Sequence, residues 1–243
     1  MDSGAGGILV LNLTKILLPN ENLLYFADFL NSPYGNKKPS TISNIMFNNI
    51  KHLNNHFKIK LYVIACNTAT ATSLDYLRRN FPDQIFVGIE PAIKPAFETN
   101  YNTLVLSTYT TFRYSKLIKK YRELNSQKLF FYPFKSLAKT IDKNLSNQSN
   151  LLSHLAVLKK YKKHNIKNVV LGCTHFNLIK EQISSILSNV EFFESSGGVV
   201  KRIQQLLIEN DLINSQNELG KVDIISSSNN SVFISQLQKL IIK

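Results

Sequence analysis

The sequence has 243 residues, of which 44% are hydrophobic, and this content supports a folded core and excludes general disorder. No apolar run is long enough to span a bilayer, and the first residues lack the basic and apolar regions of a secretory signal, so we expect a cytoplasmic protein. Two cysteines are too few for a disulfide framework or a structural zinc site, which fits a reducing compartment and predicts no metal.

The formal net charge of +13 would suit a nucleic-acid partner. The lysines are spread along the chain, however, with denser stretches at KLIKKYRE (116–123) and LKKYKKHNIK (158–167). In and just before the second stretch, Leu155, Leu158 and Tyr161 recur at helical spacing, with lysines around them as on a solvated helix face. No nucleic-acid-binding motif accompanies the charge, so we do not expect nucleic acid as a partner.

Short apolar runs alternate with amphipathic stretches along the chain. The pattern predicts strands at 23–28, 61–66, 85–89, 103–107, 128–133, 168–173 and 190–195. It predicts helices at 40–56, 69–80, 110–125, 134–163, 177–188 and 197–213. This alternation indicates an α/β fold with mostly parallel sheets, and the near-continuous apolar strands indicate that helices cover both faces. Ligands of such folds bind beyond the carboxyl ends of the strands.

Two segments of the sequence resemble each other. YVIACNTAT (62–70) and VVLGCTHFN (169–177) each run from an apolar strand through a small residue to Cys and then into a helix. The repeat predicts two similar lobes, each of which presents one cysteine to a shared cleft. We place the first lobe at 1–89 plus 195–243 and the second at 90–194, with GIEPAIKPAF (88–97) as the crossover and SSGG (195–198) as the return. SNQSN (146–150) is predicted to be a polar surface loop.

Both cysteines stand where chemistry is expected, between a strand and a helix. Because a helix N-terminus favours an anion, we expect a lowered pKa for the Cys66 thiol, with Asn67 and Thr68 as donors to an anionic ligand. Thr174 and His175 follow Cys173, and His175 can share a proton with the thiol. A lone cysteine at a strand end is ordinarily a small buried hydrophobe, but polar neighbours at both sites argue for function.

Two thiols that face each other across a cleft suit inversion at an acidic carbon. One thiolate removes a proton from one face of the carbon, and the opposite thiol donates a proton to the other face. Cysteine-protease chemistry would also use Cys and His, but it needs one thiol and an oxyanion hole.

The motifs DSGAGG, SPYG, ACNTATA, IEPAIKPA and LGCTHFNLI occur in this order between Asp2 and about Ser195. They resemble the glutamate racemases of the cofactor-independent aspartate/glutamate racemase superfamily. The resemblance implies two pseudo-symmetric α/β lobes, each a mostly parallel sheet flanked by helices, with the active site in the cleft between them. It also implies interconversion of L- and D-glutamate with no cofactor, for peptidoglycan synthesis and cell-wall biogenesis. Whether the protein is a homodimer stays open.

The resemblance implies roles for individual residues. Cys66 would serve the D-enantiomer with help from Asp2, and Cys173 would serve the L-enantiomer with help from His175. The His after "CT" favours glutamate over aspartate. The residues implied to hold the substrate are Asp2, Ser3, Pro33, Tyr34, Gly35, Asn67, Thr68, Thr111, Thr174 and His175.

Two of the departures from the family pattern bear directly on the expected site. The family has a Glu about seven residues after the position of Pro133, where Thr140 stands here, and Asp142 is a large rotation away on a helix, so whether an acid assists His175 stays open. The family also has an apolar strand before "DSG", whereas Met1 alone precedes Asp2, so we expect Asp2 on a flexible terminus and a less stable lobe. Two alternative functions stay open, namely racemisation of aspartate or another small acid, and a catalytically impaired binding protein.

Overall fold

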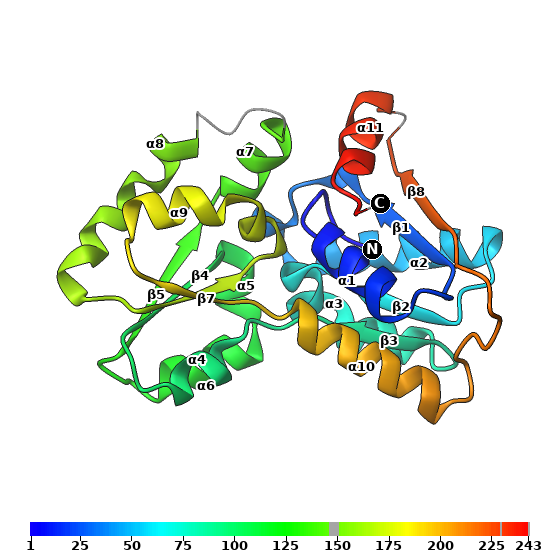
Figure 1. The fold of residues 1–243 in the computed structure, drawn as a ribbon, viewed down its shortest axis with the longest axis horizontal. Coiled ribbons are helices and arrows are strands. Elements are labelled where there is room, and N and C mark those ends of the chain that lie inside the picture. Colours follow the sequence, from blue (N-terminus) through cyan, green and yellow to red (C-terminus); the bar gives the residue numbers. More distant parts are fainter. Residues whose placement is uncertain (146–150, 229, 243) are drawn as a thin grey trace.

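The computed structural model describes residues 1–145, 151–228 and 230–242, so the loop predicted at 146–150 lies outside the described residues. The chain forms two α/β lobes that lie side by side (Figure 1). Each strand pair that the structure describes is parallel, which confirms the predicted fold class. Within these residues no helix combines the length and the apolar character that a membrane span requires.

The second lobe is built on one four-stranded sheet in the order β5-β4-β6-β7. Leu104 and Leu171 face one core cluster, while Val105 and Val170 face the other, because successive side chains of a strand point to opposite faces. Helices cover both faces. The strands of this lobe are β4 (Thr103–Thr108), β5 (Leu129–Phe134), β6 (Asn168–Gly172) and β7 (Glu191–Phe193). Its helices are α4 (Ile93–Glu98), α5 (Tyr109–Tyr114), α6 (Lys116–Glu123), α7 (Leu137–Lys143), α8 (Leu151–Leu155) and α9 (Lys180–Ile186), with 3-10 helices at Ala156–His164 and Thr174–Ile179.

The first lobe contains two separate two-stranded sheets, β1-β8 and β2-β3. Their strands are β1 (Leu23–Ala27), β2 (Leu61–Ile64), β3 (Ile85–Gly88) and β8 (Val222–Ser226). The helices of this lobe are α1 (Ile8–Leu17), α2 (Pro39–His56), α3 (Asn67–Asn80), α10 (Ser196–Glu209) and α11 (Ser231–Lys239), with 3-10 helices at Phe29–Asn31 and Tyr34–Asn36. Both labelled chain ends lie in this lobe (Figure 1).

The start of the chain lies between the two small sheets. Asp2 forms a parallel bridge with Ala27 of β1 and is only 2% exposed. The Met1 nitrogen donates to the Val63 oxygen of β2 at 2.7 Å, and the Ala65 N–H donates to the Met1 oxygen at 2.8 Å. The expectation of a flexible terminus at Asp2 is therefore wrong, because the main chain of the first two residues hydrogen-bonds to the strands on both sides.

The seven predicted strands are all present, and β8 was not predicted. The single helix predicted over 110–125 is wrong, because the chain forms α5 and α6, which meet at Ser115. The Ser115 hydroxyl accepts a hydrogen bond from the Ile118 N–H and so caps the start of α6. The helix predicted over 134–163 is also wrong in its described part, which holds α7, α8 and a 3-10 helix in place of one continuous helix.

Candidate active site

The two cysteines follow strands of different lobes. Cys66 lies just beyond β2 and directly before α3, and Cys173 lies between β6 and the 3-10 helix Thr174–Ile179. Both are free thiols and both are buried. Ser3 Oγ lies 3.9 Å from Cys66 Sγ, and the carboxylate of Asp2 beside it accepts a hydrogen bond from Thr174, the residue after Cys173. The carboxyl ends of the two sheets thus bring both thiols to one place.

The first-lobe loop DSGAGG reaches across to the second lobe. The Thr174 hydroxyl donates to one oxygen of the Asp2 carboxylate at 3.0 Å, and the Gly4 N–H donates to the other at 2.8 Å. Ser3 Oγ lies 3.9 Å from Cys66 Sγ. Burial is the main cause of a raised pKa at Asp2, which the nearby His175 partly offsets. The loop therefore brings the Asp2 carboxylate against Thr174, which follows Cys173, and the neighbouring Ser3 against Cys66.

Gly6 lies in tight contact with the residues that follow Cys173 in the second lobe. A Cβ at Gly6 would lie 2.5 Å from both His175 Nδ1 and Thr174 Oγ1 and 2.6 Å from the His175 nitrogen of the main chain. No side chain fits at such distances, so this glycine allows the loop to pack against the residues that follow Cys173.

His175 is held between a carboxylate and a thiol. Its Nε2 lies 3.0 Å from Asp142 Oδ1, and its Nδ1 lies 3.9 Å from Cys173 Sγ. Burial alone would lower the pKa of His175, but the charge and hydrogen bond of Asp142 raise this pKa well above its usual value. Asp142 therefore supplies the acid beside His175 that the sequence left open. The orientation of α7 turns Asp142 inward and leaves Thr140 half-buried on its other side.

The expected low pKa at Cys66 is also wrong. Burial raises the pKa of the Cys66 thiol to about 12, and the negative charge of Asp2 raises it further in the same direction. The Ala69 N–H at the start of α3 lowers this pKa, as the helix argument predicted, but its effect is smaller than that of burial. Cys66 is thus held as a neutral thiol, ready to donate a proton.

Three threonine hydroxyls meet where the lobes touch. Thr68 Oγ1 at the start of α3 lies 2.9 Å from Thr108 Oγ1 and 3.0 Å from Thr111 Oγ1, and the last two are 2.8 Å apart. All three residues are buried. Thr68 and Thr111 were both predicted as binding residues, and the structure brings them together. Hydroxyl groups both donate and accept, so this cluster can present donors to a carboxylate.

The SPYG loop packs against the same region. Thr110 Oγ1 donates to the Gly35 oxygen at 2.7 Å, and Pro33, half-buried, follows a cis peptide bond. The Tyr34 hydroxyl donates to the fully buried carboxylate of Asp28. The hydroxyl of Tyr34 therefore anchors its own loop, and Gly35 is the part of SPYG that meets the second lobe.

Asn67 carries an unused acceptor. Its Nδ2 donates to the Ile89 oxygen at 3.2 Å, which fixes the direction of the amide. Among the residues that the structure describes, no group donates to its buried Oδ1. A buried acceptor without a donor is costly, so a cationic or N–H donor on a ligand would be favoured here. We expected Asn67 to donate to a ligand. Its side-chain oxygen is in addition an acceptor that suits an ammonium group.

Three residues of the site were missed by sequence reasoning. Asp142 was set aside because of its position in the helix, and the only signal for it was an acid within one turn of Thr140. Asp28 follows the apolar run of β1, so its position at a strand's carboxyl end was a usable signal. Thr108 ends β4 in the same way, and its hydroxyl completes the threonine cluster.

Comparisons with known proteins agree with this arrangement. No family model matches the chain. The chain is 36% identical over 245 residues to the glutamate racemase of Clostridium novyi, and the match covers 98% of this chain and 93% of that protein. It is 34% identical over 233 residues to the glutamate racemase of Clostridium acetobutylicum, covering 93% of this chain and 90% of that protein.

Solved structures show the same fold. Glutamate racemase from Francisella tularensis in complex with D-glutamate matches with a TM-score of 0.82 at 24% identity, covering 99% of this chain and 91% of that chain. The Escherichia coli glutamate racemase, in complex with L-glutamate and the activator UDP-MurNAc-ala, also has a TM-score of 0.82 at 24% identity. The match covers 98% of this chain and 92% of that chain. With two lobes of this fold, a cysteine from each, and relatives above 30% identity over nearly its full length, the chain belongs to the glutamate racemase family.

Proposed function

We propose that this protein interconverts L- and D-glutamate by proton transfer at Cα, with Cys66 and Cys173 acting on opposite faces of the carbon. The observation that carries the proposal is that the two buried thiols come from different lobes and are linked through one set of contacts that includes Asp2, Asp142 and His175. Its relatives are named glutamate racemases, and solved structures of that fold hold D- or L-glutamate. The D-glutamate formed would supply peptidoglycan synthesis.

The two thiols are prepared for different roles. His175, kept cationic by Asp142, can donate through Nδ1 to Cys173 Sγ and so stabilise negative charge on that sulfur. Cys66 is held as a thiol by burial. The Cys173 thiolate takes the Cα proton of L-glutamate, the electron pair stays at Cα and the carboxylate, and Cys66 delivers its proton to the opposite face. The product is D-glutamate with a Cys66 thiolate, and the reverse reaction exchanges the roles.

The surrounding polar groups suit a small amino acid. The hydroxyls of Thr68 and Thr111 can donate to a carboxylate that gains charge during proton transfer, and Asn67 Oδ1 can accept from the ammonium group. We assign the remaining substrate-binding roles to the predicted set that surrounds these groups, namely Asp2, Ser3, Pro33, Tyr34, Gly35, Thr174 and His175.

The lobe boundaries and the location also belong to this proposal. We place the first lobe at 1–89 plus 195–243 and the second at 90–194, which the membership of the sheets supports. Two free thiols in the reaction suit a reducing cytoplasm.

The test is conversion of L-glutamate to D-glutamate by the purified protein, followed by circular dichroism. In heavy water the product should carry deuterium at Cα. Cys66→Ser should abolish racemisation but still exchange the Cα proton of L-glutamate, because Cys173 remains to remove and return it. Cys173→Ser should exchange only D-glutamate. A folded protein that leaves glutamate unchanged, or that turns over aspartate instead, would contradict the proposal.

A further inference from the structure

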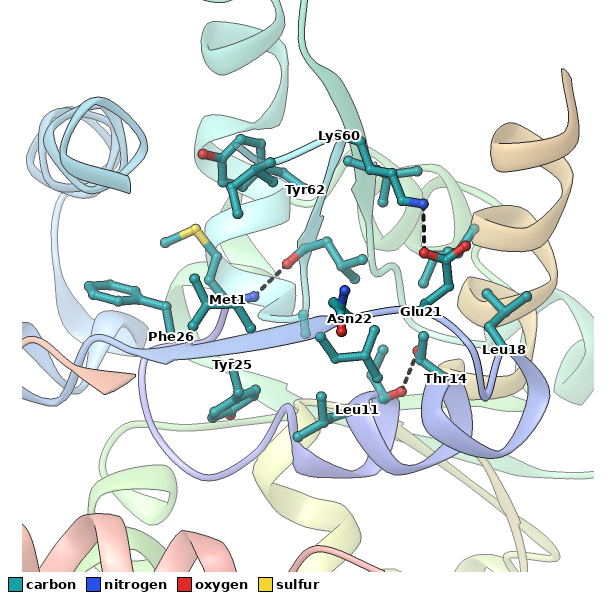
Figure 2. Close-up of a pocket in the computed structure, with 18 of the residues that line it drawn as sticks. Met1, Leu11, Thr14, Leu18, Glu21, Asn22, Tyr25, Phe26, Lys60 and Tyr62 are labelled. Carbon is teal, nitrogen blue, oxygen red and sulfur yellow. Dashed lines mark hydrogen bonds and ion pairs between the residues drawn. The ribbon is translucent and has the colours of Figure 1, made fainter. Parts of the chain in front are cut away.

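Tyr25 is a buried tyrosine of β1 that takes no part in the proposed proton transfer. Figure 2 draws it among the residues that line a cavity of about 400 Å³, on the α1 side of β1, with Phe26 on the opposite side. The Tyr25 hydroxyl donates to the Gly4 oxygen at 2.7 Å. The main chain of Gly7 lies against the same hydroxyl, since a Cβ at Gly7 would lie 3.0 Å from it. The loop DSGAGG is therefore folded around the end of this side chain.

The peptide unit between Gly4 and Ala5 is hydrogen-bonded at both of its ends. Its oxygen accepts from Tyr25, and its N–H donates to Asp142 Oδ1 at 3.1 Å. The same Asp142 oxygen lies 3.0 Å from His175 Nε2. A continuous series of contacts thus runs from a tyrosine of the first lobe to the histidine that lies beside the second-lobe thiol.

This peptide unit depends on the tyrosine for its orientation. A peptide group is planar, and its oxygen and N–H point in opposite directions, so a partner that fixes the oxygen also fixes the N–H. A Cβ at Gly4 would overlap the Asp142 carboxylate, so the main chain of Gly4 lies directly against that carboxylate. A reversed unit would turn the Gly4 oxygen toward Asp142, where two acceptors would repel each other. A hydrogen bond accepted by the oxygen also polarises the N–H and makes it a stronger donor.

The hydroxyl of Tyr25 is suited to this task because it keeps its proton. Burial raises the pKa of Tyr25 well above its usual value, and the negative charges of Asp2 and Asp142 raise it further. Tyr25 is 3% exposed and Ala5 is fully buried, so water has little access to replace a lost partner.

We propose that Tyr25 is a positioning residue for proton transfer at Cys173. Its hydroxyl orients the peptide unit after Gly4, and this unit holds Asp142 in the place from which Asp142 directs His175. The role rests on the proposed function, in which the second-lobe thiol acts on L-glutamate.

The first-lobe side of the site is held separately. The Asp2 N–H donates to the Phe26 oxygen at 3.1 Å, and the Asp2 oxygen accepts from the Asp28 N–H at 2.9 Å. These main-chain bonds keep Asp2 in place whether or not the tyrosine carries a hydroxyl. Removal of the hydroxyl should therefore slow proton transfer at Cys173 much more than at Cys66.

Tyr25→Phe removes the hydroxyl and keeps the ring, and single-thiol proteins separate its effects on the two sides. In a Cys66→Ser protein in heavy water, it should slow exchange of the Cα proton of L-glutamate at least about tenfold. In a Cys173→Ser protein, it should slow exchange of the Cα proton of D-glutamate by less than about twofold. Tyr62→Phe is the matched control and should change neither rate, because this buried tyrosine of β2 donates to Asn54 Oδ1 instead.

A second measurement requires no turnover. In NMR of the protein without glutamate, the N–H groups of Ala5 and of His175 Nε2 should exchange with solvent at least about tenfold faster in Tyr25→Phe than in Tyr62→Phe. Tyr25→4-aminophenylalanine keeps a donor at the end of the ring. It should restore both the slow exchange of these N–H groups and the rate of proton transfer at Cys173.

The proposal is overturned if Tyr25→Phe slows both single-thiol proteins equally, since the tyrosine would then only hold the loop. It is also overturned if Ala5 and His175 stay as protected as in Tyr62→Phe, or if the 4-aminophenylalanine protein is as impaired as Tyr25→Phe. If neither single-thiol protein exchanges its enantiomer of glutamate, the proposed function fails, and the NMR measurement still decides whether Tyr25 positions His175.

Discussion

Asp142 Oδ1 lies 3.0 Å from His175 Nε2, and both side chains are buried. The same carboxylate accepts hydrogen bonds from the Ala5 N–H at 3.1 Å and from the Ser32 hydroxyl at 3.3 Å. One carboxylate therefore joins α7, the residues after β6 and two loops of the first lobe. It also turns the ring of His175 so that Nδ1 faces Cys173.

Asp142→Asn should lower kcat for L-glutamate by about a hundredfold, near the lower end of the range for general acid–base catalysis. The amide carries no charge, so the pKa of His175 falls toward its usual value and the ring loses its proton at neutral pH. The loss should shrink as the pH is lowered, because a protonated ring is then restored. Rate–pH profiles of the variant and the unaltered protein measure this.

Thr140→Ala is the matched control for Asp142→Asn, since Thr140 lies on the same helix and its hydroxyl donates to the Ser136 oxygen, away from His175. It should leave the rate and the pH profile unchanged. Equal losses in both variants would mean that Asp142 acts only by stabilising α7.

Gly6→Ala should reduce activity to below about 1% of the unaltered protein, because its Cβ would lie 2.5 Å from His175 Nδ1 and must displace either the ring or the loop. Gly197→Ala is the control. A Cβ at Gly197 meets nothing within 4 Å, and the residue lies in α10, so this change should preserve activity and stabilise the fold by up to about 1 kcal/mol. Steady-state rates of both variants measure the activity, and urea unfolding measures the stability of Gly197→Ala.

Cys66 should react slowly with iodoacetamide. With its pKa raised from 9.0 to about 12, the thiolate population at pH 8 falls about a thousandfold below that of an ordinary cysteine. In a Cys173→Ser variant, where Cys66 is the sole cysteine, the labelling rate should still rise about tenfold per pH unit between pH 9 and pH 10. For the same variant unfolded in urea, the labelling rate of Cys66 should level off above about pH 9. A plateau near pH 8 in the folded protein would refute the role of Cys66 as a thiol donor.

Acetylation of the Met1 nitrogen should stabilise the protein at low pH. The folded state binds a proton at this amine less tightly than the unfolded state, with a pKa of about 6 against 8.0. The unmodified protein therefore gains stability as the pH rises from 6 to 8, by about 2.7 kcal/mol in all. An acetylated chain lacks this group, so its advantage should be largest below pH 6 and vanish above pH 8. Urea unfolding of both forms at pH 5.5 and 8.5 measures the difference, and a constant difference at both pH values would exclude the buried ammonium as its cause.

The sheet strands were predictable because each is a short apolar run between polar turns. β8 was missed, since Val222–Ser226 contains Asp223, which is exposed, and no residue of the strand is fully buried. An edge strand with one half-buried face leaves a weaker pattern than a central one. The two cysteines were predictable as a pair because the same local motif recurs around them.

Asp142 and Cys66 show what the sequence could not supply. Sequence spacing gives the rotation of Asp142 relative to Thr140, but it cannot give the direction in which α7 faces the core. At Cys66 the helix start was predicted, and its effect on the thiol was predicted with the correct sign. The depth of burial, which outweighs it, depends on tertiary packing, since Cys66 lies in a core cluster with residues from distant parts of the chain such as Tyr34 and Ile42.

Asp2 takes part in both the first-lobe sheet and the candidate active site. Its main chain pairs with β1, and its carboxylate accepts a hydrogen bond from the Thr174 hydroxyl. Any fraying of the chain start would therefore withdraw a polar group from between the thiols while most of both hydrophobic cores stayed intact. Activity on gentle heating would then decline ahead of the cooperative melting transition. The catalytic rate would therefore report the local unfolding of the first two residues before the whole protein unfolds.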